Sequence, residues 1–354
     1  AAHAHHIPDH MSPTQMVLRR TATLLILALA RLAAVDALRA QPAALHAAAA
    51  AAARGGRAAA PRLQTAPSAT SATCKLHHAE AGSMLPSSEL PLVILHGLFG
   101  AGANFQSWAK GLGDQDKSSS RRIVLVDLRN HGNSAHVPSM SYREMAADVI
   151  ALLDELGVAE CALCGHSLGG KVAMATALLH PTRIERLLVL DMAPALYERE
   201  TCTAWAEIHE VVRALRGLDV AKLASKREAG ALLEGPIPNG DMRAFALTNL
   251  VRAEGGGFRW RFNLPTIEAS LAELAGWGDG LDELVYGRNT LFVGSNSRFL
   301  RSEHLPQMQT QFTCSSVTKV RDAGHWIHSD APGPLQIVAS NFLDVETDLC
   351  GACY

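Results

Sequence analysis

The chain has 354 residues, of which 48% are hydrophobic and 19% are charged, a composition typical of globular proteins and not of fibrous or disordered ones. The formal net charge is −2, so the overall charge gives no indication of a nucleic-acid-binding protein. A chain of this length forms one large domain or two smaller ones.

The first 74 residues differ in composition from the rest of the chain. They contain seven Arg, no Lys and two acidic residues, so they carry a formal +5 and the remaining residues −7. Alanine runs with few acidic residues are typical of transit peptides. The apolar stretch 23–35 is interrupted by Arg31 and is too short to span a bilayer. We expect residues 1–74 to be an unfolded targeting leader for a mitochondrion or plastid. The alternative is a low-complexity tail on a cytoplasmic protein.

From about residue 90, apolar runs with strand character alternate with helical patterns. The predicted strands lie in LPLVILHG (90–97), RIVLVDLRNHG (122–132), ECALCG (160–165), RIERLLVLD (183–191), NTLFVG (289–294) and SSVTKVRDAGH (315–325). The predicted helices between and after them lie at 103–112, 141–157, 167–181 and 334–346. Such alternation predicts an α/β protein with a mostly parallel central sheet flanked by helices.

The alternation stops between residues 193 and 287. Helical patterns occur there at 204–218 and 219–233, but no convincing strand is present. One α/β domain with an inserted helical lid therefore fits the sequence better than two independent domains. The predicted domain spans residues 75–354, with core segments 88–192 and 288–346 and the lid at 193–287.

The segment Gly165-His166-Ser167-Leu168-Gly169 lies at the junction between a predicted strand and a predicted helix. This is the context that a G-x-S-x-G nucleophile elbow requires, in which a tight turn displays the serine at the carboxyl edge of the sheet. Glycine at the flanking positions lets neighbouring backbone approach closely. Ser167 is therefore the candidate nucleophile, and an idle serine in a glycine-rich turn is the alternative.

A serine hydroxyl needs an adjacent base, and histidine titrates in the working pH range. In a chain that orders its triad as Ser, Asp and His, the base follows the last strand. His325 in DAGHWIH has this position, and His328 is the second candidate. His96, His131 and His166 have positions that indicate structural roles.

The carboxylate that orients the histidine usually follows the strand at 289–294. That loop reads Ser295-Asn296-Ser297 and contains no acid. Asp191 ends the preceding predicted strand and reaches the same edge, so it is the candidate acid, with a helix cap or turn residue as the alternative. Ser297 is a candidate supporting hydrogen-bond donor.

Stabilising an oxyanion requires pre-aimed backbone N–H groups. The residue after the nucleophile, Leu168, offers one. The loop HGLFG (96–100) offers the other from Leu98 or Phe99, and Gly97 and Gly100 let that loop come close.

These motifs resemble those of the α/β-hydrolase superfamily over residues 88–346. The segments that carry the resemblance are LHGLFGAGANFQSW, VDLRNHGNS, GHSLGGKVAM, LVLDMAPALY, RWRFNLPTI and AGHWIHSDAP. Within the superfamily they are similar to small serine esterases that include a mitochondrial type and bacterial short-acyl esterases. RNHG, where many relatives have RGHG, and RWRFNLPTI are the specific indicators. The resemblance also implies that the acid follows the strand after the elbow helix, at Asp191.

The resemblance implies an α/β-hydrolase fold and a serine hydrolase that cleaves short-to-medium acyl esters or thioesters through an acyl-enzyme. No nucleotide-binding or metal-binding motif is present, so we expect no cofactor. The expected partner is a small acyl substrate, with no nucleic acid and no stable membrane span. The candidate lid residues for an apolar substrate pocket are Met192, Trp205, Phe245 and Trp277.

Two alternatives remain open. A carbon–carbon bond hydrolase or lyase of the same fold would keep the triad but would need polar lid groups for an acidic substrate, for which Arg243, Arg252 and Arg259 are candidates. A ligand receptor with an intact triad would turn over very slowly.

Overall fold

The computed structural model describes residues 73–83, 87–115 and 121–344, which all belong to one compact unit, residues 70–354. Residues 1–72 of the expected leader lie outside the described residues. The last leader residue, Cys74, is buried, and its N–H donates to Asp148 Oδ1 at 2.8 Å. Cys74 therefore packs as part of the folded unit. Within the three described ranges, no helix is both long and apolar enough to cross a membrane.

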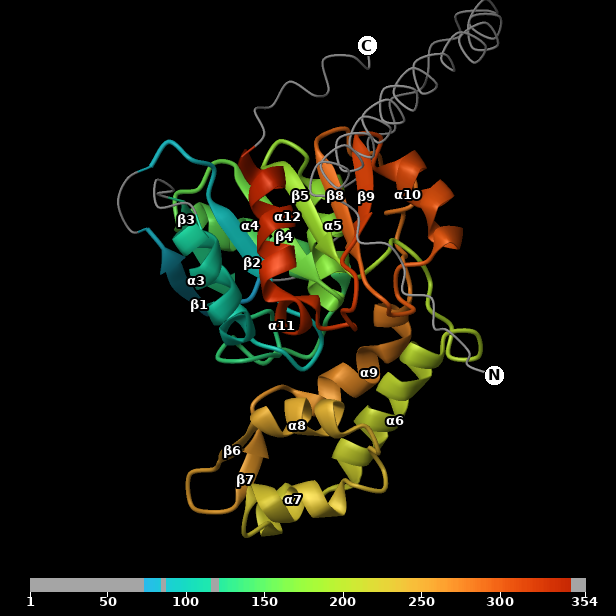
Figure 1. Cartoon of the computed structure of the whole chain (residues 1–354). Helices are drawn as coiled ribbons and strands as arrows, with labels where there is room; N and C mark the ends of the chain where they lie inside the picture. Colours follow the sequence, from blue (N-terminus) through green and yellow to red (C-terminus); the bar gives the residue numbers. More distant parts are fainter. Residues whose placement is uncertain (1–72, 84–86, 116–120, 345–354) are drawn as a thin grey trace, which may run out of the picture. The chain divides into compact units, whose positions relative to one another are not determined.

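A seven-stranded sheet forms the centre of this unit (Figure 1). Its spatial order is β1 (His78–Gly82), β3 (Arg122–Val126), β2 (Leu92–Leu95), β4 (Cys161–His166), β5 (Ile184–Leu190), β8 (Thr290–Gly294) and β9 (Ser315–Lys319). Only the pairing of β1 with β3 is antiparallel. The expected mostly parallel sheet is thus confirmed. The sequence did not predict β1, because HAEAG has no apolar run and pairs only at the sheet edge.

Helices cover both faces of the sheet. Their bounds are η1 (Gly102–Phe105), α3 (Gln106–Gln115), α4 (Tyr142–Glu155), α5 (Leu168–Leu179), η3 (Ser302–His304), α10 (Leu305–Gln311), α11 (Ile327–Asp330) and α12 (Pro332–Asp344). In β2, Val93 and Leu95 join the apolar cluster that includes α4 and α5, whereas Leu92 and Ile94 join the cluster that includes α3 and α12. Both faces of the strand are therefore buried, which explains its continuous apolar run.

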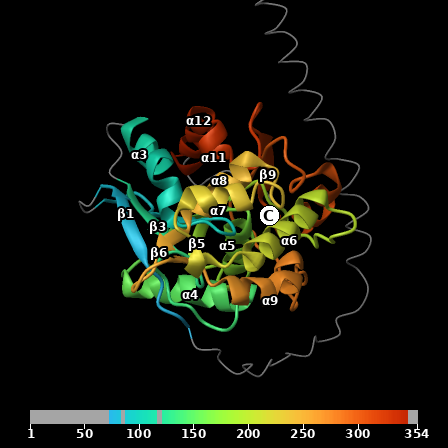
Figure 2. The ribbon, with the colours of Figure 1, turned by 90° about the horizontal axis from the view of Figure 1, so that it is seen from below.

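Residues 193–287, called the insertion below, lie between β5 and β8. The insertion contains α6 (Thr203–Gly217), η2 (Val220–Lys222), α7 (Lys226–Leu232), α8 (Gly240–Thr248), β6 (Leu250–Arg252), β7 (Phe258–Trp260) and α9 (Leu264–Ala275). Seen from below, α7 and α8 lie in front of the sheet (Figure 2). His166 at the end of β4, Met192 after β5 and residues of the insertion line one cavity, so the insertion covers the carboxyl ends of these strands.

Two expectations for the insertion are wrong. A short antiparallel hairpin, β6–β7, is present, and its three-residue strands are too short to show a period of two. The single helix expected at 219–233 is divided into η2 and α7. The division occurs because Ser225 caps α7 by accepting a hydrogen bond from the Glu228 N–H.

Candidate active site

Ser167 lies at a strained turn between β4 and α5. Its backbone has φ 54° and ψ −119°, a conformation that costs a non-glycine residue about 1–3 kcal/mol. A Cβ at Gly165 would lie 2.1 Å from the Gly169 oxygen, and one at Gly169 would lie 2.4 Å from the Leu95 oxygen. The turn therefore excludes a side chain at both flanking positions, as the elbow motif requires.

The structure brings Asp191 and His325 into direct contact. His325, in the loop between β9 and α11, donates from Nδ1 to Asp191 Oδ2 at 2.7 Å. The side chain of Asp191 is completely buried, whereas that of His325 is 22% exposed. A buried carboxylate that holds one ring nitrogen fixes the tautomer and leaves the other nitrogen free to accept a proton.

Two serines after β8 complete the surroundings of Asp191. Ser297 Oγ donates to Asp191 Oδ2, and the Ser295 N–H donates to Asp191 Oδ1 at 3.2 Å. These contacts form because β5 and β8 are parallel neighbours, so both chain segments leave the sheet at the same edge. Ser297 lies in the loop after β8, where the acid usually stands, and it hydrogen-bonds to Asp191.

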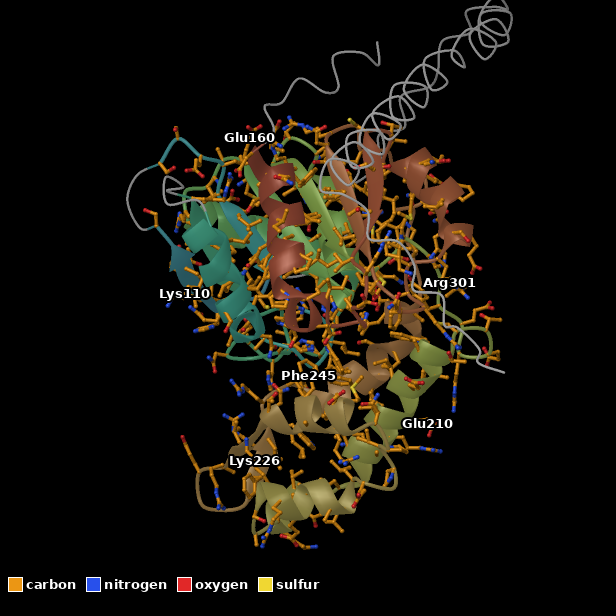
Figure 3. The ribbon with its side chains drawn as sticks, viewed as in Figure 1. Lys110, Glu160, Glu210, Lys226, Phe245 and Arg301 are labelled. Atoms are coloured by element: carbon orange, nitrogen blue, oxygen red, sulfur yellow. The ribbon has the colours of Figure 1, made fainter. Side chains whose placement is uncertain are left out.

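Ser167 and His325 line the same cavity. Met192, Trp205 and Phe245 also line it, and Figure 3 shows Phe245 on the part of the insertion nearest to the sheet. Trp277 does not line the cavity. Its Nε1 donates instead to Gln311 Oε1 at 3.0 Å, so the expectation that Trp277 lines the pocket is corrected.

The two candidate N–H donors of the 96–100 loop are not equivalent. The Phe99 N–H donates to His131 Nε2 at 3.2 Å, so Phe99 is corrected from a candidate oxyanion donor to part of the loop support. Among the described residues, no hydrogen bond engages the N–H of Leu98 or of Leu168, the first residue of α5. Both lie in the wall of the cavity.

The second candidate base, His328, also lines the cavity but does not contact Asp191. It stacks on Phe105 with ring centroids 4.0 Å apart, and its Nδ1 is buried without a hydrogen-bond partner in the described part of the chain. Burial, with a smaller contribution from the nearby His325, lowers the pKa of His328 to about 4. The carboxylate therefore favours His325 as the base.

The three arginines considered for an acidic substrate lie outside the cavity lining. Arg243 donates to the Ile237 oxygen at 2.6 Å, and the guanidinium of Arg252 lies 4.3 Å from the centroid of the Phe258 ring. In the described ranges, no group of three or more His, Cys, Asp or Glu side chains is placed to hold a metal ion.

Lys171 is a cavity residue that the sequence interpretation missed. Its ammonium is buried and donates to the Ala275 and Gly276 oxygens at 2.9 and 2.6 Å, at the end of α9. It also lies 4.6 Å from the centroid of the Tyr197 ring. Burial lowers the pKa of Lys171, while the carbonyls at the helix C-terminus favour its charged form. A lysine within the otherwise apolar helix 168–179 was the signal available.

Comparison with known proteins places this chain in a family. The family profile described as "alpha/beta hydrolase fold" matches residues 91–216. The sn-1-specific diacylglycerol lipase ABHD11 of Danio rerio is 38% identical over 247 residues, covering 68% of this chain and 74% of that protein. The chain belongs to the α/β-hydrolase family. Esterase YbfF of Escherichia coli is 29% identical over 68% of this chain and 88% of its own length.

Solved structures agree with this assignment. A marine microorganism esterase aligns with a TM-score of 0.71 and 30% identity, covering 76% of this chain and all of that one. The protein is thus an esterase/lipase-type α/β hydrolase, and the expected fold and family are confirmed.

The two segments that gave the most specific resemblance to this hydrolase family contact each other. Asn130, from RNHG, accepts two hydrogen bonds from Asn263. The Asn263 backbone N–H donates to the Asn130 backbone oxygen at 2.8 Å, and Asn263 Nδ2 donates to Asn130 Oδ1 at 3.1 Å. Asn263, from RWRFNLPTI, caps α9 by accepting from the Thr266 N–H. The loop after β3 and the insertion of the hydrolase are therefore joined by these two asparagines.

We expect the hydrolase to lose stability in mild acid because His131 is buried and neutral. Its Nε2 accepts from Phe99, and burial lowers its pKa from 6.5 to about 3. This contribution to stability is complete above pH 6.5 and is lost progressively as the pH falls from 6.5 towards 3. At pH 5 the loss from His131 is about 2 kcal/mol.

Urea unfolding at pH 7 and pH 5 checks this expectation. His131→Gln, which stays neutral, should reduce the difference in unfolding free energy between the two pH values by about 2 kcal/mol. Part of the difference should remain, since burial also lowers the pKa of His96 and of His166. An unchanged difference in the variant would contradict the assignment.

Proposed function

We propose that this hydrolase cleaves short-to-medium acyl esters or thioesters through an acyl-enzyme on Ser167. The observation that carries the proposal is the 2.7 Å hydrogen bond between Asp191 and His325, beside a cavity that both His325 and the strained Ser167 line. Nucleophilic acyl transfer requires two parts: a hydroxyl that is exposed to the substrate, and a base that a buried carboxylate orients.

The reaction proceeds in two halves. His325 Nε2 removes the proton of Ser167 Oγ as this oxygen attacks the substrate carbonyl, and the Leu98 and Leu168 N–H groups bind the resulting oxyanion. The tetrahedral adduct then collapses, the bond to the leaving group breaks, and His325 returns the proton to the departing oxygen or sulfur. Water, deprotonated by His325, attacks the acyl-enzyme; the bond between the acyl carbon and Ser167 Oγ then breaks, His325 returns the proton to Oγ, and the acid is released.

Ser297 acts through Asp191 in this scheme and is a positioning residue. Its hydroxyl proton satisfies one lone pair of Asp191 Oδ2, the oxygen that also accepts from His325. The carboxylate is thereby held against the imidazole and stabilises the imidazolium that forms when Ser167 is deprotonated.

The cavity favours a substrate with an apolar acyl chain, because the lysine in its wall, Lys171, already donates to the Ala275 and Gly276 oxygens. Its walls carry Trp205, Phe245 and Met192, which favour an apolar chain over a carboxylate. The names of the relatives, a diacylglycerol lipase and esterases, agree with ester substrates. We further propose that the leader directs the enzyme to an organelle, a mitochondrion or plastid.

The test combines covalent labelling with a substrate panel. A fluorophosphonate probe should label the protein on the peptide that contains Ser167, as read by mass spectrometry. Nitrophenyl esters and acyl thioesters should be turned over, with a preference set by acyl length, whereas a panel of diketones should not. Absence of labelling together with absence of ester and thioester hydrolysis would refute the proposal. Labelling with very slow turnover would favour a receptor, and diketone cleavage a carbon–carbon bond hydrolase.

A further inference from the structure

Three side-chain hydrogen bonds reach the backbone of Gly97 and Phe99 in the loop that offers the Leu98 N–H, one from within the loop and two from other parts of the protein. The Phe99 N–H donates to His131, and the Gly97 oxygen accepts from His96 Nδ1 at 2.7 Å. The third bond comes from the insertion, where Asn249 Nδ2 donates to the Phe99 oxygen at 2.7 Å. Asn249 is buried, with 3% of its surface exposed.

The contact from Asn249 continues to Leu98 through two peptide units. The Phe99 oxygen shares its peptide unit with the Gly100 N–H, which donates to the Gly97 oxygen at 2.9 Å. The Gly97 oxygen shares its own peptide unit with the Leu98 N–H. Because a trans peptide is planar and its N–H and C=O point in opposite directions, fixing each oxygen also fixes the direction of the N–H in the same unit.

We propose that Asn249 is a positioning residue that aims and polarises the Leu98 N–H as an oxyanion donor. The inference rests on the proposed function, because an oxyanion forms at this loop only if Ser167 attacks a carbonyl. The order of donation is Asn249 Nδ2 to the Phe99 oxygen, then the Gly100 N–H to the Gly97 oxygen, then the Leu98 N–H to the oxyanion. Hydrogen bonds arranged head to tail strengthen one another.

The loop needs this support because it is strained. Phe99 has φ 61°, a conformation that a bulky side chain avoids without surrounding contacts. A residue of the insertion therefore contributes to holding a catalytic loop of the core. Asn249 itself is held by its backbone, since its oxygen accepts from the Arg261 N–H at 2.8 Å and it ends α8.

Asn249→Ala removes the donor, and Asn249→Asp replaces it with an acceptor of nearly the same shape. Loss of a whole oxyanion donor costs about 10²–10³-fold in kcat, so misdirecting Leu98 should lower kcat about 10-fold while KM changes less than about 2-fold. Affinity for a trifluoromethyl ketone, which forms a tetrahedral oxyanion adduct, should fall about 10-fold as well. Affinity for the corresponding methyl ketone should stay unchanged.

Thr266→Val is the matched control. Thr266 Oγ1 donates to the Val137 oxygen at 3.3 Å, so this change also removes one hydrogen bond from the insertion to the core, but it leaves the 96–100 loop untouched. Thr266→Val should keep wild-type kcat and trifluoromethyl ketone affinity. Thermal unfolding identifies any variant that fails to fold, and Asn249→Asp then replaces Asn249→Ala as the informative variant.

The outcomes separate this inference from the proposed function. A wild-type protein that hydrolyses esters, with folded Asn249 variants of unchanged kcat, would overturn the role of Asn249 alone. The same would follow if the Asn249 variants lost affinity equally for both ketones, because the defect would then lie in substrate binding. A wild-type protein that neither hydrolyses esters nor binds the trifluoromethyl ketone more tightly than the methyl ketone would overturn both.

Discussion

Replacing Ser167 with alanine should lower kcat/KM for the best ester or thioester by about 10⁴–10⁶-fold, because the group that forms the acyl-enzyme is lost. The substitution removes one oxygen from the cavity wall and leaves the hydrogen bond between Asp191 and His325 in place. The protein should therefore fold normally, and its substrate affinity should remain measurable.

Initial-rate kinetics and fluorophosphonate labelling measure this effect, and both should be lost together. Ser270→Ala is the control, because Ser270 is a buried serine in α9 outside the cavity lining. It should keep full labelling and full activity. Hydrolysis by Ser167→Ala at more than about one hundredth of the wild-type rate would mean that another residue is the nucleophile.

The second large effect is expected at the carboxylate. Asp191→Asn should lower kcat by about 10⁴-fold, because an amide can donate to His325 Nδ1 and so stabilises the wrong tautomer. Ser297→Ala should cost only about 10–100-fold, since it removes one hydrogen bond to a charged group, which contributes about 1.5–3 kcal/mol. The loss at Ser297 is indirect, because its hydroxyl contacts Asp191.

Comparing the two single variants tests the assignment of the acid. Steady-state rates at several pH values give kcat for each, with the exposed Asp282→Asn as the control for the change from aspartate to asparagine. Asp282 lies in the insertion outside the cavity lining, and its replacement should leave kcat unchanged. A larger loss in Ser297→Ala than in Asp191→Asn would show that Asp191 is not the orienting acid.

The parallel sheet and the elbow could be predicted because each leaves a local pattern. Buried strands such as β2 and β4 are continuous apolar runs, and the capping box that opens α4 at Ser141 and Glu144 is visible in four residues. The turn around Ser167 requires glycine on both sides, so its geometry is also encoded in adjacent positions.

What the sequence did not predict depends on contacts between distant segments. Asn249 contacts Phe99 across 150 positions, and nothing in its neighbourhood distinguishes it from any asparagine at a helix end. Trp277 was predicted to line the pocket because it is a large apolar residue of the insertion, but its Nε1 donates a hydrogen bond to Gln311. Whether Leu98 or Phe99 has a free N–H depends on where His131 points, which only the folded loop after β3 determines.

Lys171 has a consequence for how a substrate enters. If α9 moved away from α5, the buried ammonium of Lys171 would lose its hydrogen bonds to the carbonyl oxygens at the end of α9. Breaking these contacts costs several kcal/mol. The wall formed by α9 should therefore stay closed during turnover. We therefore expect substrate to reach the cavity past segments other than α9.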